Sequence, residues 1–158
     1  MAVEVGQEAP DFILKNQAGE EVSLSSFRGA KNVVLMFYPL AFSGICTKQF
    51  ADISANEGRY GGEQAQVLGV SVDSHYGQAA FAKSLGLDET MMLADFEPKG
   101  AVAQDYGVYI EERGYSTRAT FVIDKQGIIQ RADVVVPLAV PDEDAVLAAL
   151  TTCNVEGD

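Results

Sequence analysis

Several residue types are scarce in this sequence, and each scarcity excludes a class of protein. Its 158 residues include two cysteines, Cys46 and Cys153, one histidine and no tryptophan. Two cysteines are too few for a disulfide scaffold, and their separation does not match the spacing of zinc ligands. A chain of this length can bury a core without such staples. In a reducing compartment, a cysteine of this kind is either catalytic or merely buried.

Basic residues and long apolar runs are also scarce. Lys and Arg total 11 against 23 Asp and Glu, which gives a formal net charge of −12. Such a chain is repelled by nucleic acids and anionic lipids, so neither is expected as a partner. The acidic start lacks the basic and apolar segments of a signal peptide, and the longest apolar run, Val33–Phe42, is shorter than the roughly 20 residues of a membrane span. We therefore expect a soluble, cytoplasmic protein.

The chain shows no repeat, linker or low-complexity stretch, so a single domain is expected over residues 1–158. Hydrophobic patterning and turn residues predict strands over 11–14, 21–24, 32–38, 67–72, 91–94, 119–124 and 128–135. They predict helices from just after 43 to about 59, over 75–85, over 100–106, and from about 141 onward. This order predicts an α/β protein whose mixed central sheet is flanked by helices, with an added N-terminal hairpin. A thioredoxin-like fold fits it best.

The turn between the strand at 32–38 and the following helix carries the most informative residues. Ser43 is a good N-cap type, and a helix that starts after it places Cys46 in the first turn. There the unpaired amides and the helix dipole favour a thiolate, and α/β sheets place ligands at the carboxyl ends of such strands. Position alone leaves a second interpretation open, in which Cys46 is a small buried hydrophobe at a helix start.

The spacing of three residues at this turn resembles a known motif. Pro39, Ser43 and Cys46 form Pro-x-x-x-Ser-x-x-Cys, which closely resembles the peroxiredoxin motif Pro-x-x-x-Thr/Ser-x-x-Cys. Residues 37–46 look most like the one-cysteine alkyl hydroperoxide reductase E subfamily. Residues 6–14 are similar to the family's opening strand, and residues 118–124 to its arginine-bearing strand. In outline, the resemblance covers about residues 5–150.

The resemblance implies a thiol-dependent peroxidase that acts in antioxidant defence, reducing hydrogen peroxide and organic hydroperoxides, with peroxynitrite as a further candidate. Cys46 would attack the peroxide and become a sulfenic acid. Arg118 would hold the thiolate and the peroxide oxygens, Ser43 would offer a hydroxyl, and Pro39 would shield the pocket from water. Gln49 stands where relatives often have Glu and is a further candidate for substrate binding. No metal or cofactor is implied.

The recycling step departs from several family patterns. Position 51 is Ala, so one type of resolving cysteine is missing, and Cys153 lies in a context unlike known resolving segments. We expect an external thiol, or a thioredoxin- or glutaredoxin-like protein, to reduce Cys46. Cys153 stays open as a resolving residue, within one chain or across a dimer. The resemblance implies a homodimer, although the sequence reveals no exposed apolar patch for it.

Two other functions compete with the peroxidase. A thiol–disulfide oxidoreductase requires a second cysteine close to the first, but residues 47–49, which follow Cys46, are Thr-Lys-Gln. A thioredoxin-like binding or chaperone module is distinguished by whether Cys46 reacts with stoichiometric peroxide. The single histidine, His75, is interpreted as a helix-start residue after Ser74 rather than as a base for Cys46.

Overall fold

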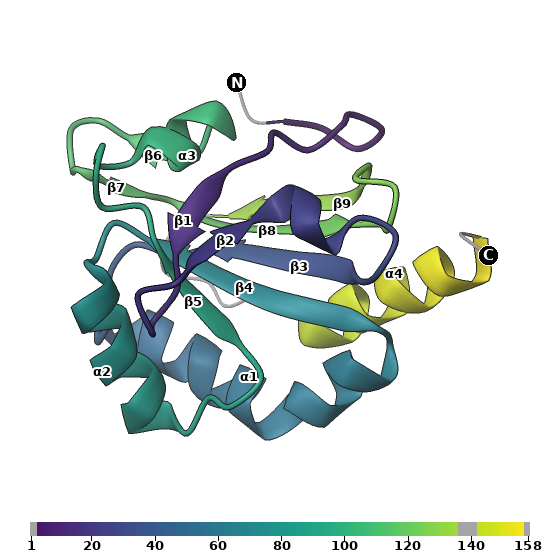
Figure 1. The fold of residues 1–158 in the computed structure, drawn as a ribbon, viewed down its shortest axis with the longest axis horizontal. Helices are drawn as coiled ribbons and strands as arrows, with labels where there is room; N and C mark the ends of the chain where they lie inside the picture. Colours follow the sequence, from purple (N-terminus) through teal and green to yellow (C-terminus); the bar gives the residue numbers. More distant parts are fainter. Residues whose placement is uncertain (1–2, 136–141, 157–158) are drawn as a thin grey trace.

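The computed structural model of the chain describes residues 3–135 and 142–156. Within these residues, a seven-stranded sheet has the order β2-β1-β5-β4-β3-β8-β9 (Figure 1). Its strands are β1 (Ile13–Lys15), β2 (Glu21–Ser23), β3 (Asn32–Phe37), β4 (Ala65–Ser71), β5 (Met91–Ala94), β8 (Arg118–Ile123) and β9 (Ile129–Val135). The short strands β6 (Tyr109–Ile110) and β7 (Tyr115–Ser116) pair separately. The helices are η1 (Leu24–Phe27), α1 (Gly44–Gly62), α2 (His75–Leu85), α3 (Ala101–Asp105) and α4 (Glu143–Glu156).

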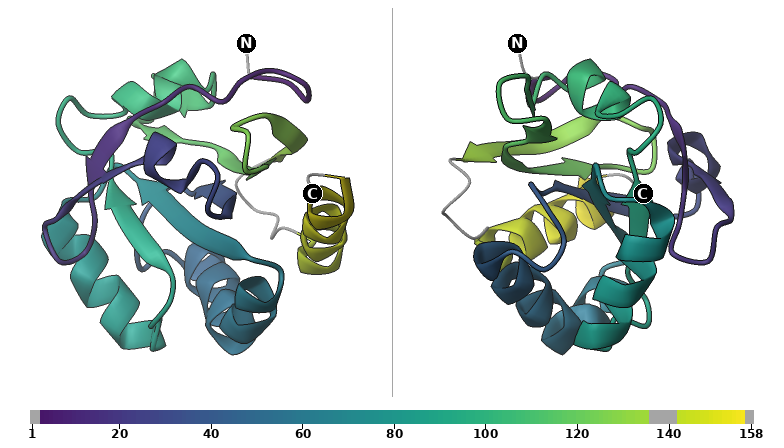
Figure 2. Two further views of the ribbon diagram at one scale, coloured as in Figure 1. Left: turned by 45° about the vertical axis from the view of Figure 1, so that its right-hand side comes forward. Right: turned by 90° about the vertical axis from the view of Figure 1, so that its left-hand side faces the viewer.

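The apolar run at 32–37 forms a central strand that is buried on both faces, as its lack of alternation predicts. Val34 and Met36 point into one cluster, with side chains from α1, α2 and α4. Val33, Leu35 and Phe37 point into the other, with side chains from the N-terminal segment, η1 and α3. The helices therefore form a layer on each side of the sheet (Figure 2).

Strand directions bring distant parts of the chain to one edge of the sheet. β3 runs parallel to β4, and β4 runs parallel to β5, so their carboxyl ends lie together. β8 is antiparallel to β3, with Ala119 opposite Phe37, so β8 starts where β3 ends. Both α1 and α2 begin at this edge, each shortly after the strand that precedes it. This is the edge where α/β sheets place their ligand sites.

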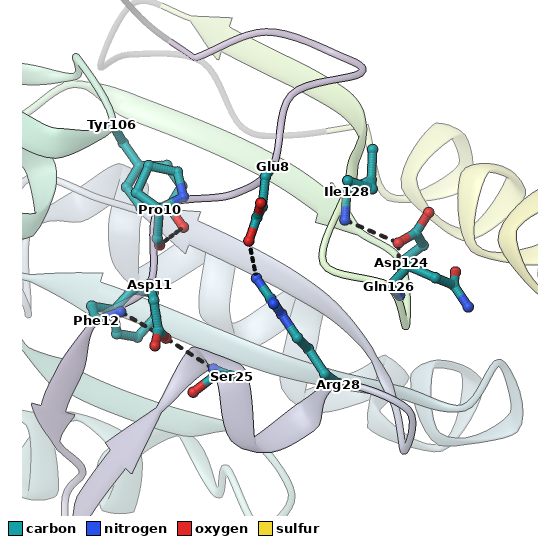
Figure 3. A network of polar contacts seen from close by, with 10 residues as sticks. All are labelled: Glu8, Pro10, Asp11, Phe12, Ser25, Arg28, Tyr106, Asp124, Gln126 and Ile128. Carbon is teal, nitrogen blue, oxygen red and sulfur yellow. Dashed lines mark hydrogen bonds and ion pairs between the residues drawn. The ribbon is translucent and has the colours of Figure 1, made fainter.

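Some boundaries differ from the sequence prediction. α1 continues three residues past Arg59, through Gly61 and Gly62, and the N–H of Glu63 closes its end on the Arg59 carbonyl. β1 begins at Ile13 rather than Asp11, because the Asp11 carboxylate accepts from the backbone N–H groups of Phe12 and Ser25 (Figure 3). η1, β6 and β7 were not predicted.

The predicted start of the last helix, near residue 141, lies at the border of the described residues. α4 is described from Glu143, with two acidic residues in its first turn as expected, whereas Pro141 lies outside the described residues. In the part of the chain that the structure describes, no helix is long and apolar enough to cross a membrane.

Candidate active site

Cys46 is the third residue of α1, at the carboxyl edge of β3. Its side chain is fully buried and shares one helix face with Phe50 and Ile53, as their spacing predicts. The first turn of a helix has backbone N–H groups without intrahelical partners, and the positive end of the dipole lies there. This position stabilises a negatively charged sulfur.

Arg118 lies beside this cysteine although it is 72 positions away in the chain. Its Nη1 donates to the Cys46 Sγ over 3.2 Å. The contact arises because Arg118 starts β8, next to the Ala119–Phe37 pair at the end of β3. Arg118 is only 2% exposed, which excludes a solvated surface charge. The guanidinium thus brings a hydrogen-bond donor and a positive charge to the sulfur.

Gln49 completes the contact on the next turn of α1. Its carbonyl oxygen Oε1 accepts from the same Arg118 Nη1, and its Nε2 donates to the Met36 Sδ over 3.6 Å. Gln49 is itself buried, so this amide holds the guanidinium from a fixed position. Because the amide is neutral, it orients Arg118 without cancelling its charge.

The structure brings Cys46, Arg118 and Gln49 together but directs the Ser43 hydroxyl elsewhere. Ser43 occupies the predicted N-cap position, and its carbonyl accepts the first helical bond from the Thr47 N–H over 2.8 Å. The expected side-chain cap does not form, and the Ser43 Oγ instead donates to the Leu40 carbonyl over 2.8 Å. Pro39 is buried two residues past the end of β3, which agrees with its predicted role in stopping the strand.

The residue before the N-cap has a backbone conformation that the sequence did not indicate. Phe42 has a φ of 68°, in the left-handed region that bulky side chains rarely adopt. Its ring packs on Phe81 of α2, with 5.2 Å between the ring centroids. Strain of this kind persists only where surrounding contacts hold it, so the turn before α1 is held by its neighbours.

The two remaining candidates lie away from this cluster. Cys153 is buried in α4, and the next residue, Asn154, accepts from the Asn32 side chain over 2.8 Å at the start of β3. His75 is the first residue of α2, after the N-cap Ser74, as predicted. The contact between Gln49 and the Met36 sulfur has no signal in the sequence. The hydrogen bond between Ser71 and Asp73 does have one, because both residues are polar and lie at or just after the carboxyl end of β4.

The chain is similar to known proteins over most of its length. A model of the AhpC/TSA family matches residues 5–132. Alkyl hydroperoxide reductase E of Mycobacterium tuberculosis is 41% identical over 151 residues, which cover 93% of this chain and 97% of that protein. The crystal structure of peroxidoxin BcpB from the same organism superposes with a TM-score of 0.84 at 30% identity and covers 94% of this chain and 97% of its own.

A more distant structure extends the same likeness. The reduced 2-Cys peroxiredoxin of Plasmodium vivax superposes with a TM-score of 0.85 at 28% identity, covering 99% of this chain and 86% of its own. The similarity of fold thus spans almost the whole chain, and the predicted thioredoxin-like fold is confirmed.

Proposed function

The chain belongs to the AhpC/TSA family of peroxiredoxins and is a thiol-dependent peroxidase, and from this premise we propose that Cys46 is its peroxidatic residue. The observation that carries the proposal is the 3.2 Å contact from the Arg118 Nη1 to the Cys46 Sγ. A buried sulfur at a helix start, beside a buried cation, is a nucleophile in a site prepared for negative charge.

The first half-reaction needs only these residues and a peroxide. The Cys46 thiolate attacks one oxygen of the O–O bond and forms an S–O bond while the O–O bond breaks. The leaving oxygen takes both bonding electrons and a proton from solvent, and it departs as water or an alcohol. The sulfur is oxidised to a sulfenic acid, and the peroxide is reduced by two electrons.

Arg118, Ser43, Pro39 and Gln49 have separate roles in this proposal. Arg118 stabilises the thiolate and the charge that develops on the leaving oxygen, for which one well-placed donor contributes about 2.7–4 kcal/mol in other enzymes. Gln49 holds the guanidinium by accepting from Nη1. The Ser43 hydroxyl turns from the Leu40 carbonyl to the peroxide once substrate enters. Pro39, which is buried, keeps water away from the Cys46 sulfur.

We propose that an external thiol, or a thioredoxin- or glutaredoxin-like protein, reduces the sulfenic acid. The support is the position of Cys153, which adjoins Asn154 at the amino end of β3, whereas Cys46 lies past its carboxyl end. A resolving cysteine in the same chain would have to move along the length of β3, on the same face of the sheet. The substrates proposed are hydrogen peroxide, organic hydroperoxides and peroxynitrite.

We also propose a homodimer, for which the structure offers a surface that the sequence did not reveal. The apolar side chains of Leu40, Phe42, Tyr76 and Phe96 are exposed, Tyr76 by 77%. Phe42 packs on α2, Tyr76 belongs to the first turn of that helix, and Tyr76 and Phe96 line one cleft. A second copy that covers this apolar face would remove it from water.

Two broader proposals complete the functional assignment. Residues 1–158 act as one domain, which is supported by a single seven-stranded sheet that uses strands from β1 to β9 of the described chain. The protein works in the cytoplasm, a proposal that rests on the sequence, whose two cysteines are too few for the disulfide scaffold of a small secreted domain.

The test of the peroxidase assignment is replacement of Cys46 by serine. Cys46→Ser is nearly isosteric, but its hydroxyl stays protonated, so peroxide reduction should stop while the fold remains. Cys153→Ser is the matched control and should retain turnover with an external thiol. Turnover of Cys46→Ser above a tenth of the wild-type rate would remove Cys46 from the mechanism.

A further inference from the structure

A buried polar network at the carboxyl end of β4 takes no part in the reaction described above. The Tyr38 hydroxyl donates to the Gln78 Oε1, and the Gln78 Nε2 donates to the Ser71 Oγ over 3.0 Å. The Ser71 Oγ donates to the Asp73 Oδ2 over 2.6 Å. The same carboxylate oxygen accepts from the backbone N–H of Ala41 over 2.8 Å. The network therefore bonds to the segment before α1 at two points, the Tyr38 side chain and the Ala41 backbone.

These hydrogen bonds fix the segment that precedes α1. We call Ser71, Asp73 and Gln78 the clamp, since they hold residues 38–41 at both ends. Pro39 lies between the two held points, and the N-cap of α1 follows Ala41 by two residues. The position of the first turn of α1, and hence of Cys46, depends on this segment.

The buried polar groups of this network indicate that it positions residues 38–41 and does more than fill space in the core. Tyr38, Ser71 and Gln78 are buried, and polar groups in such a place cost free energy unless every one is paired. Pairing is achieved here, since the second Gln78 N–H bond goes to the Leu93 carbonyl over 2.7 Å. Burial raises the pKa of Tyr38 above its ordinary value, so its hydroxyl stays protonated and donates.

We propose that Asp73 is a positioning residue for peroxide reduction, because it fixes the turn of residues 38–43 and thereby sets Cys46 against Arg118. The inference rests on the proposed role of Cys46. The left-handed backbone of Phe42, directly after Ala41, is the feature most in need of such a hold. Without the Asp73 carboxylate, the turn would relax and Pro39 and the first turn of α1 would shift.

The experiment compares two substitutions at Asp73. Stopped-flow mixing of the reduced protein with hydrogen peroxide gives the rate constant of Cys46 oxidation. Asp73→Ala removes both contacts, and the rate constant should fall by about tenfold to a hundredfold, as misplacement by about 1 Å does elsewhere. Asp73→Asn should restore most of the rate, because Ala41 and Ser71 donate to one oxygen, Oδ2, and an amide oxygen can accept both bonds.

Two further readouts separate positioning from a loss of stability. Alkylation of Cys46 by iodoacetamide should become faster in Asp73→Ala as peroxide reduction becomes slower, because a relaxed turn exposes the buried sulfur. In the wild type, hydrogen exchange at the Ala41 amide should be strongly protected, and this measurement needs no variant. Glu57→Ala is the control, since Glu57 also accepts backbone N–H groups, at residues 88–90, beyond the other end of β4. It should leave both Cys46 rates unchanged.

The inference is overturned if Asp73→Ala oxidises at the wild-type rate, or if the Ala41 amide exchanges as fast as an open loop. It is also overturned if folded Asp73→Asn is as slow as Asp73→Ala. A failure of the peroxidase assignment is recognised separately, by turnover of Cys46→Ser, whereas amide exchange at Ala41 reports on the clamp alone.

Discussion

Cys46 and Cys153 lie at opposite ends of β3. Cys153 adjoins Asn154, whose side chain bonds to Asn32 at the first position of the strand. Cys46 contacts Arg118, which starts β8 one residue before Ala119, the partner of the last residue of β3. Six residues of β-strand span roughly 17 Å. In Figure 1, α4 ends on the right of the sheet, and β3 points to the left.

This separation decides what one chain can do after oxidation. A disulfide needs Cα atoms about 4.4–6.8 Å apart. Cys46 and Cys153 are buried in one apolar cluster on the same face of the sheet, but toward opposite ends of β3. Joining the two sulfurs in one subunit would require residues of α1, of α4 or of both to move from these positions. This separation supports the proposed cycle, in which an external thiol reduces Cys46.

Arg118 is expected to control the rate of oxidation. Arg118→Ala should slow Cys46 oxidation by about 10²–10³-fold, because it removes the donor and the cation beside the sulfur. Arg118→Lys should recover part of the rate, since it restores the charge but not the planar fork. The measurement is stopped-flow oxidation by hydrogen peroxide, with Arg131→Ala as the control, since Arg131 pairs with Asp133 on β9. Wild-type rates in both Arg118 variants would contradict this role.

Gln49 is expected to act through Arg118. Gln49→Ala removes the acceptor of Nη1, so oxidation should slow by about tenfold or more as the guanidinium loses its position. Gln49→Glu keeps an acceptor at the same place and should retain part of the rate, because the carboxylate still orients the guanidinium but offsets some of its charge. The peroxide oxidation rates of the two variants provide the test. Equal losses in both would show that the neutral amide itself, and not its acceptor, matters.

Tyr76 is expected to report on the dimer surface. Tyr76→Asp places a charge in the exposed apolar face and should raise the dimer dissociation constant by about tenfold or more. Val155→Asp is the control, because Val155 is exposed to a similar degree but lies on α4. Light scattering at micromolar concentration checks both. A wild type that stays at about 17 kDa, the mass of one chain, would refute the dimer.

The elements that form the site were predictable where burial sets the sequence pattern. The unbroken apolar residues of β3 predicted a strand buried on both faces, and the spacing of Cys46, Phe50 and Ile53 predicted one buried helix face. Both patterns record how side chains divide between core and solvent, which depends on the period of each element. The start of α1 followed from its N-cap residue and the proline before it.

Single contacts between distant segments could not be predicted in this way. The bond from the Ala41 N–H to Asp73 joins positions 32 apart, and it exists only because β3 and β4 are parallel neighbours. The Ser43 hydroxyl could accept from a backbone N–H of the first helical turn or donate to a nearby carbonyl, and it donates to the Leu40 carbonyl without capping the helix. The positive φ of Phe42 could not be predicted from the sequence, because phenylalanine rarely adopts a left-handed backbone conformation.

Asp11 is expected to stabilise the N-terminal segment in a pH-dependent way. Burial opposes its ionisation, but the backbone N–H groups of Ser25 and Phe12 outweigh this and hold the pKa of Asp11 below its ordinary value. Its stabilisation is therefore present above the unfolded pKa of about 3.9 and is lost as pH falls through the folded pKa. At pH 7, Asp11→Ala should lower the free energy of unfolding by about 1 kcal/mol.

Urea denaturation of Asp11→Ala and the wild type at pH 7 and at pH 3 checks this dependence. The difference between the two proteins should shrink at the lower pH. Asp11→Asn is the control: its amide oxygen can accept both bonds, so its loss at pH 7 should be smaller than that of Asp11→Ala, while its difference from the wild type should shift with pH by the same amount, because neither variant titrates. A difference for Asp11→Ala that is constant with pH would assign the effect to packing instead of charge.

The most direct test of the account is to oxidise the reduced protein with one equivalent of hydrogen peroxide in the presence of dimedone and no reductant. Intact mass, peptide mapping and a non-reducing gel then locate the oxidised sulfur. The account predicts one dimedone adduct per chain, on Cys46, with Cys153 recovered as a thiol. Rapid and quantitative formation of a Cys46–Cys153 disulfide, within a chain or between two chains, would contradict it.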